Sequence, residues 1–401
     1  MSLPISKRSS LLGTENAFVV LAEVNRLIGA GKDIISFCIG QPDFPTPANV
    51  RRAAIQAIEE GRHGYTASAG IPELRQAIAA DVSRTRGVPV TPEDVVVGGG
   101  AKPFIGYAIL TVTDYGAGDE VIYPVPGFPI YESQIRASGA VPVALPLREA
   151  RAFAFDLGDL AARITPRTRM VILNTPHNPT GGILDAATIR AIADLLAGHP
   201  DIWIYADEIY SRLVYDGAFA SIASVPGMLE RTIISDGASK TWAMTGWRIG
   251  YAVNRTLAPH FTRWVTNTES CANHMAQYAA LEAIAGPQAD ADRMKDSFHT
   301  RRDLVVRLLN DVPGFRCLSP GGAFYAWPNV TEACRMTGCS DSEEMRKRLL
   351  HEAGVAVLAD IHFGERVAGE GQHLRLSYAA SNEAIEKGVG RIADWVRARK
   401  S

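Results

Sequence analysis

Residues 235–251 read SDGASKTWAMTGWRIGY and hold the most informative pattern in the chain. Lys240 stands there among small residues, shortly after the β-branched run 232–234. A lysine in a tight turn lined by glycine and serine loses hydration, which lowers its pKa and favours the neutral amine that Schiff-base chemistry needs. Arg248, together with Ser239, has the chemistry to hold a phosphate near that amine. An isolated Ser-Lys pair is more often part of a polar surface loop, so this interpretation needs support from other motifs.

The composition argues against several classes of protein. The chain has 401 residues, of which 47% are hydrophobic and 21% charged, and its formal net charge is −2. This length favours two lobes over one compact core. With this balance, the chain has no excess of positive charge that would indicate binding to nucleic acid or to an anionic membrane. The sequence has no run of about eighteen apolar residues, which a membrane span needs, and residues 1–10 lack the apolar segment of a signal peptide.

The cysteine pattern bears on location and on metal binding. The cysteines are odd in number, scattered and never in CxxC spacing: Cys38, Cys271, Cys317, Cys334 and Cys339. This pattern favours reduced thiols over a disulfide framework or a zinc site. We therefore expect a cytoplasmic protein without a metal centre.

Short β-branched runs alternate with longer amphipathic runs from about residue 92 onward. The predicted strands are 95–97, 120–123, 141–143, 170–173, 202–205 and 232–234. The predicted helices include 51–60, 104–112, 130–138 and 186–196. Strands that alternate with helices predict a mostly parallel sheet covered on both faces.

The pattern changes after about residue 290. A long charged helix is predicted over 293–310, and short strands are predicted over 324–327 and 374–377. These elements indicate a smaller α+β lobe. We expect the first forty residues to pack with that lobe.

Polar motifs follow several predicted strands, at the sheet edge where open α/β sheets bind ligands. The small residues 98–101 precede Lys102 and a helix, so backbone N–H groups there can approach a phosphate. Taken alone, this segment is more often a plain strand-to-helix turn. Pro103 stands where a dinucleotide-binding motif needs its third glycine, which argues against a nicotinamide dehydrogenase.

Two further motifs follow the strands 170–173 and 202–205. The loop 174–182, NTPHNPTGG, holds Asn178 among prolines, which fixes the direction of its side-chain amide. We interpret His177 as a loop residue rather than a base. Asp207 ends a hydrophobic strand, where burying a carboxylate costs free energy unless a cation lies beside it. For Asp207 taken alone, a role as a helix N-cap explains the residue equally well.

These motifs, taken in this order, resemble those of the class I/II pyridoxal-phosphate (PLP) aminotransferases, in the prokaryotic aspartate-aminotransferase-like subgroup of fold type I. The resemblance runs over about residues 35–381. It implies an α/β fold whose large domain, 46–289, has a mostly parallel seven-stranded sheet covered by helices. A smaller α+β domain would be built from both termini, 1–45 and 290–401.

The resemblance also implies residue roles. Lys240 would form the aldimine with PLP, Asp207 would face the ring nitrogen, and Tyr210 and Asn178 would contact the 3′-oxygen. The phosphate would be held by the backbone at Ala101 and Lys102, with Ser239 and Arg248, and Phe128 would stack on the ring. Tyr65 would reach the phosphate of a neighbouring subunit, which implies a homodimer. Arg375, Asn178 and Gly40 would bind the substrate α-carboxylate.

The implied activity is transfer of an amino group from an L-amino acid to a 2-oxo acid in a ping-pong cycle. Lys102 matches a lysine that in this subgroup helps to hold acidic side chains, which gives a mild lean toward aspartate or glutamate. A PLP-dependent β-lyase or decarboxylase on the same fold remains an alternative, because it would use the same Lys240 and Asp207. A non-catalytic PLP-binding sensor is another, although no basic DNA-binding segment precedes the fold.

Two positions depart from the pattern of the family. Residues 359–364 read ADIHFG where relatives often have Pro-Gly, in a loop near the substrate entrance, so we expect side-chain preference to differ. Gly237 stands where several relatives carry a phosphate-binding serine, which leaves the phosphate to the other residues named above.

Overall fold

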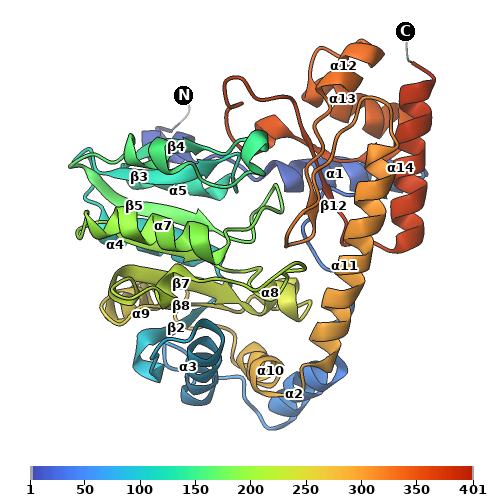
Figure 1. Cartoon of the computed structure of the whole chain (residues 1–401). Coiled ribbons are helices and arrows are strands. Elements are labelled where there is room, and N and C mark those ends of the chain that lie inside the picture. Colours follow the sequence, from blue (N-terminus) through green and yellow to red (C-terminus); the bar gives the residue numbers. More distant parts are fainter. Residues whose placement is uncertain (1–2, 400–401) are drawn as a thin grey trace.

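The computed structural model describes residues 3–399 and has a large α/β body beside a smaller lobe (Figure 1). The body is built on one seven-stranded sheet with strand order β2-β8-β7-β6-β5-β3-β4. Its strands are β2 (Val95–Gly98), β3 (Glu120–Val125), β4 (Val141–Pro146), β5 (Thr168–Asn174), β6 (Trp203–Asp207), β7 (Thr232–Gly237) and β8 (Gly250–Val253). Neighbouring strands are parallel except for β8, which is antiparallel to both β2 and β7. The predicted mostly parallel sheet is confirmed.

Helices cover both faces of this sheet. They are α2 (Ala48–Glu59), α3 (Pro72–Arg86), α4 (Lys102–Val112), α5 (Ile130–Ser138), α6 (Leu157–Ala161), α7 (Ala186–Ala197), α8 (Ala238–Thr241), α9 (Ala258–Thr268) and α10 (His274–Ala285). Along β5, Met170 and Ile172 pack into one buried cluster with α4, α5 and α9, whereas Val171 and Leu173 pack into another with α7. Because successive side chains of a strand point to opposite faces, a strand buried on both sides needs the continuous apolar run seen here.

The smaller lobe combines both ends of the chain. Its elements are α1 (Asn16–Gly29), β1 (Ile35–Ser36), α11 (Ala289–Asn310), β9 (Tyr325–Ala326), α12 (Thr331–Thr337), α13 (Ser342–Arg348), β10 (Val355–Ala356), β11 (Leu358–Ala359), β12 (Leu374–Ser377) and α14 (Asn382–Arg397). β1 pairs in parallel with β10, and β12 lies between β11 and β9 in an antiparallel sheet. The predicted α+β lobe built from both termini is confirmed, and the domain boundaries at 45/46 and 289/290 stay predictions.

The six strands predicted for the large sheet are all present, but the sequence interpretation missed β8. Its four residues, Gly250–Val253, are fully buried between β2 and β7. A strand this short that begins with glycine leaves too little periodicity to be recognised. Helix α11 also begins at Ala289 rather than 293, with Asp290 and Asp292 in its first turn, where carboxylates interact favourably with the helix dipole. Within residues 3–399, no helix has the length and apolar character that a membrane crossing requires.

Candidate active site

One cavity of about 450 Å³ lies at the carboxyl ends of the central strands and extends to the small lobe. Parallel strands place their carboxyl ends along one sheet edge, so loops that are distant in sequence meet there. Of the residues named from the sequence, these line the cavity: Gly40, Ala101, Lys102, Phe128, Asn178, Asp207, Tyr210, Ser239, Lys240, Arg248 and Arg375. The remaining one, Tyr65, lies outside the cavity, and the residue is 89% exposed.

Lys240 projects from the short helix α8, which begins directly after β7. Its Nζ donates a hydrogen bond to the backbone oxygen of Gly40 at 2.6 Å. Burial lowers the pKa of Lys240 to about 8. An appreciable fraction of the amine is therefore neutral near neutral pH, as a nucleophile or general base requires.

Asp207 ends β6 and is almost fully buried. Its carboxylate accepts hydrogen bonds from the Tyr131 hydroxyl at 2.6 Å and from the Ile209 backbone N–H at 3.4 Å. Burial raises the pKa of Asp207 to about 6. No cationic side chain among residues 3–399 forms an ion pair with it, so Asp207 can accept a cation from a ligand.

Arg375 lies in β12 and is 3% exposed. It donates to Asn178 Oδ1 at 3.0 Å and to the backbone oxygen of Cys38 at 2.6 Å, while its buried Nε has no hydrogen-bond partner in the described part of the chain. The rings of Tyr325 and Phe363 flank the guanidinium, with centroids 4.6 and 4.9 Å from Cζ. None of the described carboxylates pairs with Arg375, which leaves it free to bind an acidic ligand.

Tyr210 contributes a hydroxyl that lies 2.7 Å from the Tyr325 hydroxyl. Burial holds the pKa of Tyr210 well above its usual value, so the hydroxyl remains a neutral donor. Tyr325 also lies close to the backbone of Gly40, and a Cβ at that position would overlap the Tyr325 hydroxyl. Gly40 therefore allows the N-terminal segment to approach the cavity closely.

One end of the cavity has the character of an anion site. Lys102 begins α4 and Ala101 precedes it, so the positive end of the helix dipole faces this region. Arg248 adopts φ 59 and donates to the backbone oxygens of Gly99 and Thr245 at 3.0 and 2.9 Å. With the buried Ser239 beside them, these groups supply the donors that a phosphate requires.

Gly237, the second departure noted in the sequence, has a structural explanation. A Cβ at this position would lie 2.9 Å from both Gly250 Cα and the Ile249 backbone oxygen. The close approach of β7 to β8 therefore excludes a serine side chain here, unless the backbone moves.

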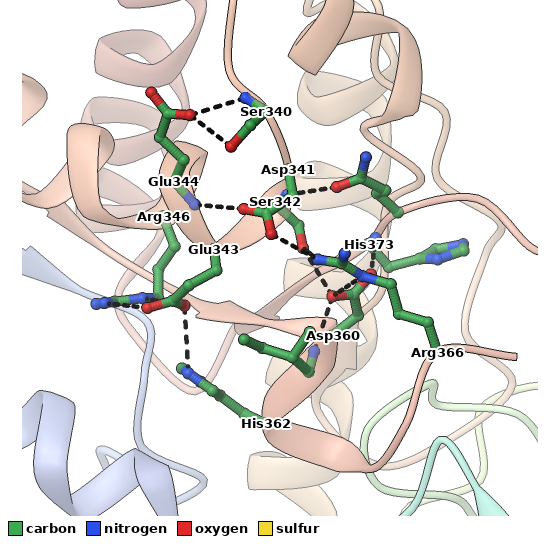
Figure 2. A network of polar contacts seen from close by, with 12 residues as sticks. Ser340, Asp341, Ser342, Glu343, Glu344, Arg346, Asp360, His362, Arg366 and His373 are labelled. Carbon is green, nitrogen blue, oxygen red and sulfur yellow. Dashed lines mark hydrogen bonds and ion pairs between the residues drawn. The ribbon is translucent and has the colours of Figure 1, made fainter.

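The loop 359–364, the first departure noted in the sequence, is held by a buried carboxylate (Figure 2). Asp360 accepts hydrogen bonds from Ser342 Oγ at 2.7 Å, from the His373 backbone N–H at 3.0 Å and from Arg366 Nε at 3.1 Å. At the end of the loop, the Phe363 carbonyl accepts from the Gly127 N–H at 2.8 Å. The loop thus connects α13 with the aromatic wall around Arg375.

Sequence reasoning missed several residues that line the cavity: Glu15, Phe18, Ile39, Gln41, Ile105, Tyr131, Ile209, Asn174, Thr245, Gly246 and Tyr325. Asn174 had a signal, since it is the first polar residue after 170–173. Its Oδ1 accepts from the Asn178 N–H at 3.0 Å, and its Nδ2 donates to the Asp207 backbone oxygen at 3.0 Å. Tyr131 and Tyr325 had none, because each occurs within an apolar periodic run.

A second group of buried charges lies outside the cavity. Arg86 pairs with Glu208 at 2.9 Å and with Asp236 at 2.6 Å. Ser221 and Ser211 donate to these carboxylates at 2.5 and 2.9 Å. Every charge in this group has an oppositely charged protein partner, in contrast to Asp207 and Arg375.

The comparisons with known proteins agree over almost the whole chain. The sequence model of the family "Aminotransferase class I and II" matches residues 32–392. Aspartate aminotransferase of Geobacillus stearothermophilus is 37% identical over 99% of this chain and 100% of its own length. Asparagine–oxo-acid transaminase of Streptococcus mutans is 39% identical over 92% of this chain and 93% of its own.

Solved structures show the same relationship. The aspartate aminotransferase of Rhizobium meliloti superposes with a TM-score of 0.92 at 34% identity, over 100% of both chains. That of Thermus thermophilus, solved with maleate, superposes with a TM-score of 0.91 at 33% identity, over 98% of this chain and 100% of its own. The chain therefore belongs to the class I and II aminotransferases, a family of enzymes that in general depends on PLP.

Proposed function

We propose that this chain binds PLP in the cavity and transfers the amino group of an L-amino acid to a 2-oxo acid in a ping-pong cycle. One observation carries the proposal: a buried carboxylate without a cation, Asp207, and a buried guanidinium without a carboxylate, Arg375, line the same cavity as Lys240. A cationic ring nitrogen would supply the missing partner of Asp207, and an α-carboxylate would supply that of Arg375.

The residues present fit PLP at each of its polar groups. Lys240 would hold its aldehyde carbon, Asp207 its ring nitrogen, and Tyr210 with Asn178 its 3′-oxygen. The backbone at Ala101 and Lys102, with Ser239 and Arg248, would hold its phosphate, and Phe128 would lie against the ring. Bound PLP supplies an electron sink for the negative charge left when a substrate loses its α-proton.

The chain's own residues would position the substrate and move the proton. Arg375 and Asn178 would bind the α-carboxylate and so fix the direction of the Cα–H bond. Lys240 Nζ would take the proton from Cα as a base and deliver it as an acid to the former aldehyde carbon of the cofactor, a role that suits a pKa of about 8. The buried tyrosines Tyr210 and Tyr325 would limit access of water to Nζ.

We propose that the donor is of aspartate type. The relatives named above act on aspartate or asparagine according to their names, and a further relative from Cereibacter sphaeroides is named aspartate/prephenate aminotransferase at 38% identity. Lys102 supports the proposal because it lines the cavity next to Phe128 and would donate a hydrogen bond to the side-chain carboxylate or amide of such a donor.

Cofactor titration and a donor screen test the proposed activity. The purified protein should acquire the visible absorbance of bound PLP and then convert aspartate, asparagine or glutamate to the matching 2-oxo acid with 2-oxoglutarate or pyruvate as acceptor. Ammonia release without an acceptor would favour the β-lyase alternative, and carbon dioxide release would favour the decarboxylase. An absorbance that is the same in the Lys240→Ala variant would contradict the assignment of Lys240.

We further propose that the active form is a homodimer in the cytoplasm. Ile55 and Ile58 on α2 have exposed apolar side chains, and the exposed Tyr65 follows a few residues later in the chain, which supports a partner subunit at this segment. All five cysteines are free, which supports a reducing compartment. Tyr65→Phe should weaken PLP affinity about tenfold or less if Tyr65 reaches the partner's phosphate, and sedimentation should show a dimer.

A further inference from the structure

Glu15 lines the cavity, and the proposed function gives it no role. It precedes α1, and its Oε2 lies 2.5 Å from Nζ of Lys102 at the start of α4. Its side chain makes no capping hydrogen bond to α1, although it stands at the N-cap position. Its carboxylate therefore contacts the cavity lysine instead of satisfying the end of its own helix.

The charges that line the cavity show what this contact does. The cations are Lys102, Lys240, Arg248 and Arg375, and the carboxylates are Glu15 and Asp207. Under the proposed function, the cofactor or the substrate backbone would supply a partner group for Lys240, Arg248, Arg375 and Asp207. Lys102 is the cation left to meet a substrate side chain, and Glu15 already neutralises it.

We propose that Glu15 is a specificity-determining residue: by pairing with Lys102, it favours donors with a side-chain amide over donors of the same shape with a side-chain carboxylate. The inference rests on the proposed function, since selection needs a bound amino acid. A carboxylate at Lys102 would share one ammonium group with Glu15 and be repelled by it. An amide can accept a hydrogen bond from Lys102 and donate one to Glu15.

The charge of Glu15 also acts beyond Lys102. It opposes the fall in the pKa of Lys240 and contributes to the rise in the pKa of Tyr325, although burial is the main cause of both shifts. A side-chain carboxylate on the substrate would therefore be repelled by the negative charge of Glu15. This supports discrimination by charge rather than by size.

Aspartate and asparagine are the matched pair of substrates that tests the proposal. The donor half-reaction, followed spectroscopically without an acceptor, gives a rate constant per unit donor concentration for each. Glu15→Gln should raise the aspartate-to-asparagine ratio of these constants by about tenfold or more, which corresponds to about 1.4 kcal/mol. Lys102→Gln should lower the ratio, because it leaves Glu15 unpaired at the cavity.

Glu23→Gln is the matched control. Glu23 lies on the same helix α1, pairs with His351 at 3.1 Å and does not line the cavity. It should leave the ratio within about twofold, a difference of less than about 0.5 kcal/mol. Thermal unfolding of each variant checks that the fold is retained, and Glu15→Ser gives a second removal of the charge should Glu15→Gln unfold.

Ligand binding gives a readout that does not depend on turnover. Calorimetry measures the dissociation constants of maleate and of maleamate, its monoamide. Glu15→Gln should lower the dissociation constant of maleate and leave that of maleamate nearly unchanged. Ratios unchanged in both assays would overturn the role of Glu15. Failure of every donor in every variant, with no PLP bound, would instead overturn the proposed function.

Discussion

Asp207 and Glu208 are adjacent in sequence and both buried, yet their surroundings differ. Glu208 pairs with Arg86, which also binds Asp236, and Ser221 donates to it. Asp207 accepts from Tyr131 and has no ion-pair partner among the described residues. Two of the buried arginines differ in the same way, because within residues 3–399 Arg86 contacts two carboxylates and Arg375 contacts none.

This difference separates structural charges from charges kept for a ligand. A buried ion that lacks a partner lowers the free energy of unfolding by several kcal/mol. We therefore expect a fold to keep such an ion only where a bound ligand supplies the opposite charge. Around Arg86 the protein itself completes the cluster. At the cavity a cofactor and a substrate would do so, which gives each group a predictable response to substitution.

The largest expected contrast is between Lys240→Ala and Arg86→Ala. Lys240→Ala should lower the rate of transamination by about 10⁴-fold or more, because it removes both the nucleophile and the proton carrier. It should leave stability nearly unchanged, since Lys240 makes one backbone hydrogen bond and no ion pair in the described chain. Arg86→Ala should destabilise the protein by about 3–5 kcal/mol. Single-turnover kinetics and urea unfolding measure the two effects.

The neighbouring pair Asp207→Asn and Glu208→Gln sharpens the contrast. Asp207→Asn should lower kcat by about 10²–10³-fold, because it removes a preorganised charge at the reacting system. Glu208→Gln should instead cost about 3 kcal/mol of stability by weakening the Arg86 cluster. If both substitutions act mainly on stability, the division between structural and ligand-directed charges is wrong. Steady-state kinetics with saturating PLP and urea unfolding decide this.

The pH dependence of stability should reveal the unpaired state of Asp207. Its folded pKa of about 6 lies above its unfolded value, so its contribution is fully present at low pH and is lost as pH rises through about 6. Without PLP, the wild type should therefore lose about 2 kcal/mol relative to Asp207→Asn between pH 4 and 7. Urea unfolding of both proteins across this range measures the difference. Equal pH profiles would show that Asp207 is not strained by burial.

The smallest expected effect concerns the loop held by Asp360. Asp360→Asn weakens its hydrogen bonds to Ser342 and Arg366 and should loosen Phe363 next to Arg375. The expected result is a severalfold rise in KM, corresponding to about 1 kcal/mol, with kcat changed less. Ser340→Ala, in the same polar network but bonded to Glu344, is the control and should leave KM unchanged. A fall in kcat alone would contradict a positioning role.

Six of the seven strands of the large sheet could be predicted because each carries a short β-branched run, and in β5, β6 and β7 that run ends in polar residues. The same endings pointed to Asn178, Asp207 and Lys240, which all line the cavity. The partners of these residues could not be found in this way. Tyr131 and Tyr325 have the spacing of core residues, and their contacts with Asp207 and Tyr210 exist only after helix and sheet are packed.

The role of Glu15 could not be predicted from the sequence either. A lone acidic residue before a helix has no distinctive pattern, and its contact with Lys102 joins positions 87 residues apart. Tyr65 is a different case, because its proposed partner would be another chain. Long-range packing and assembly, rather than local propensity, decide these contacts.

The hydrogen bonds of Arg375 have a consequence for synthesis of the protein. They join β12 to Cys38 and Asn178, which are 337 and 197 positions earlier in the chain. A ribosome makes the lysine-bearing part of the cavity well before the strand that carries Arg375. The growing polypeptide can thus fold the large sheet early, but it acquires its carboxylate-binding arginine only when β12 emerges. Enzymatic competence is for this reason a late event in the life of each molecule.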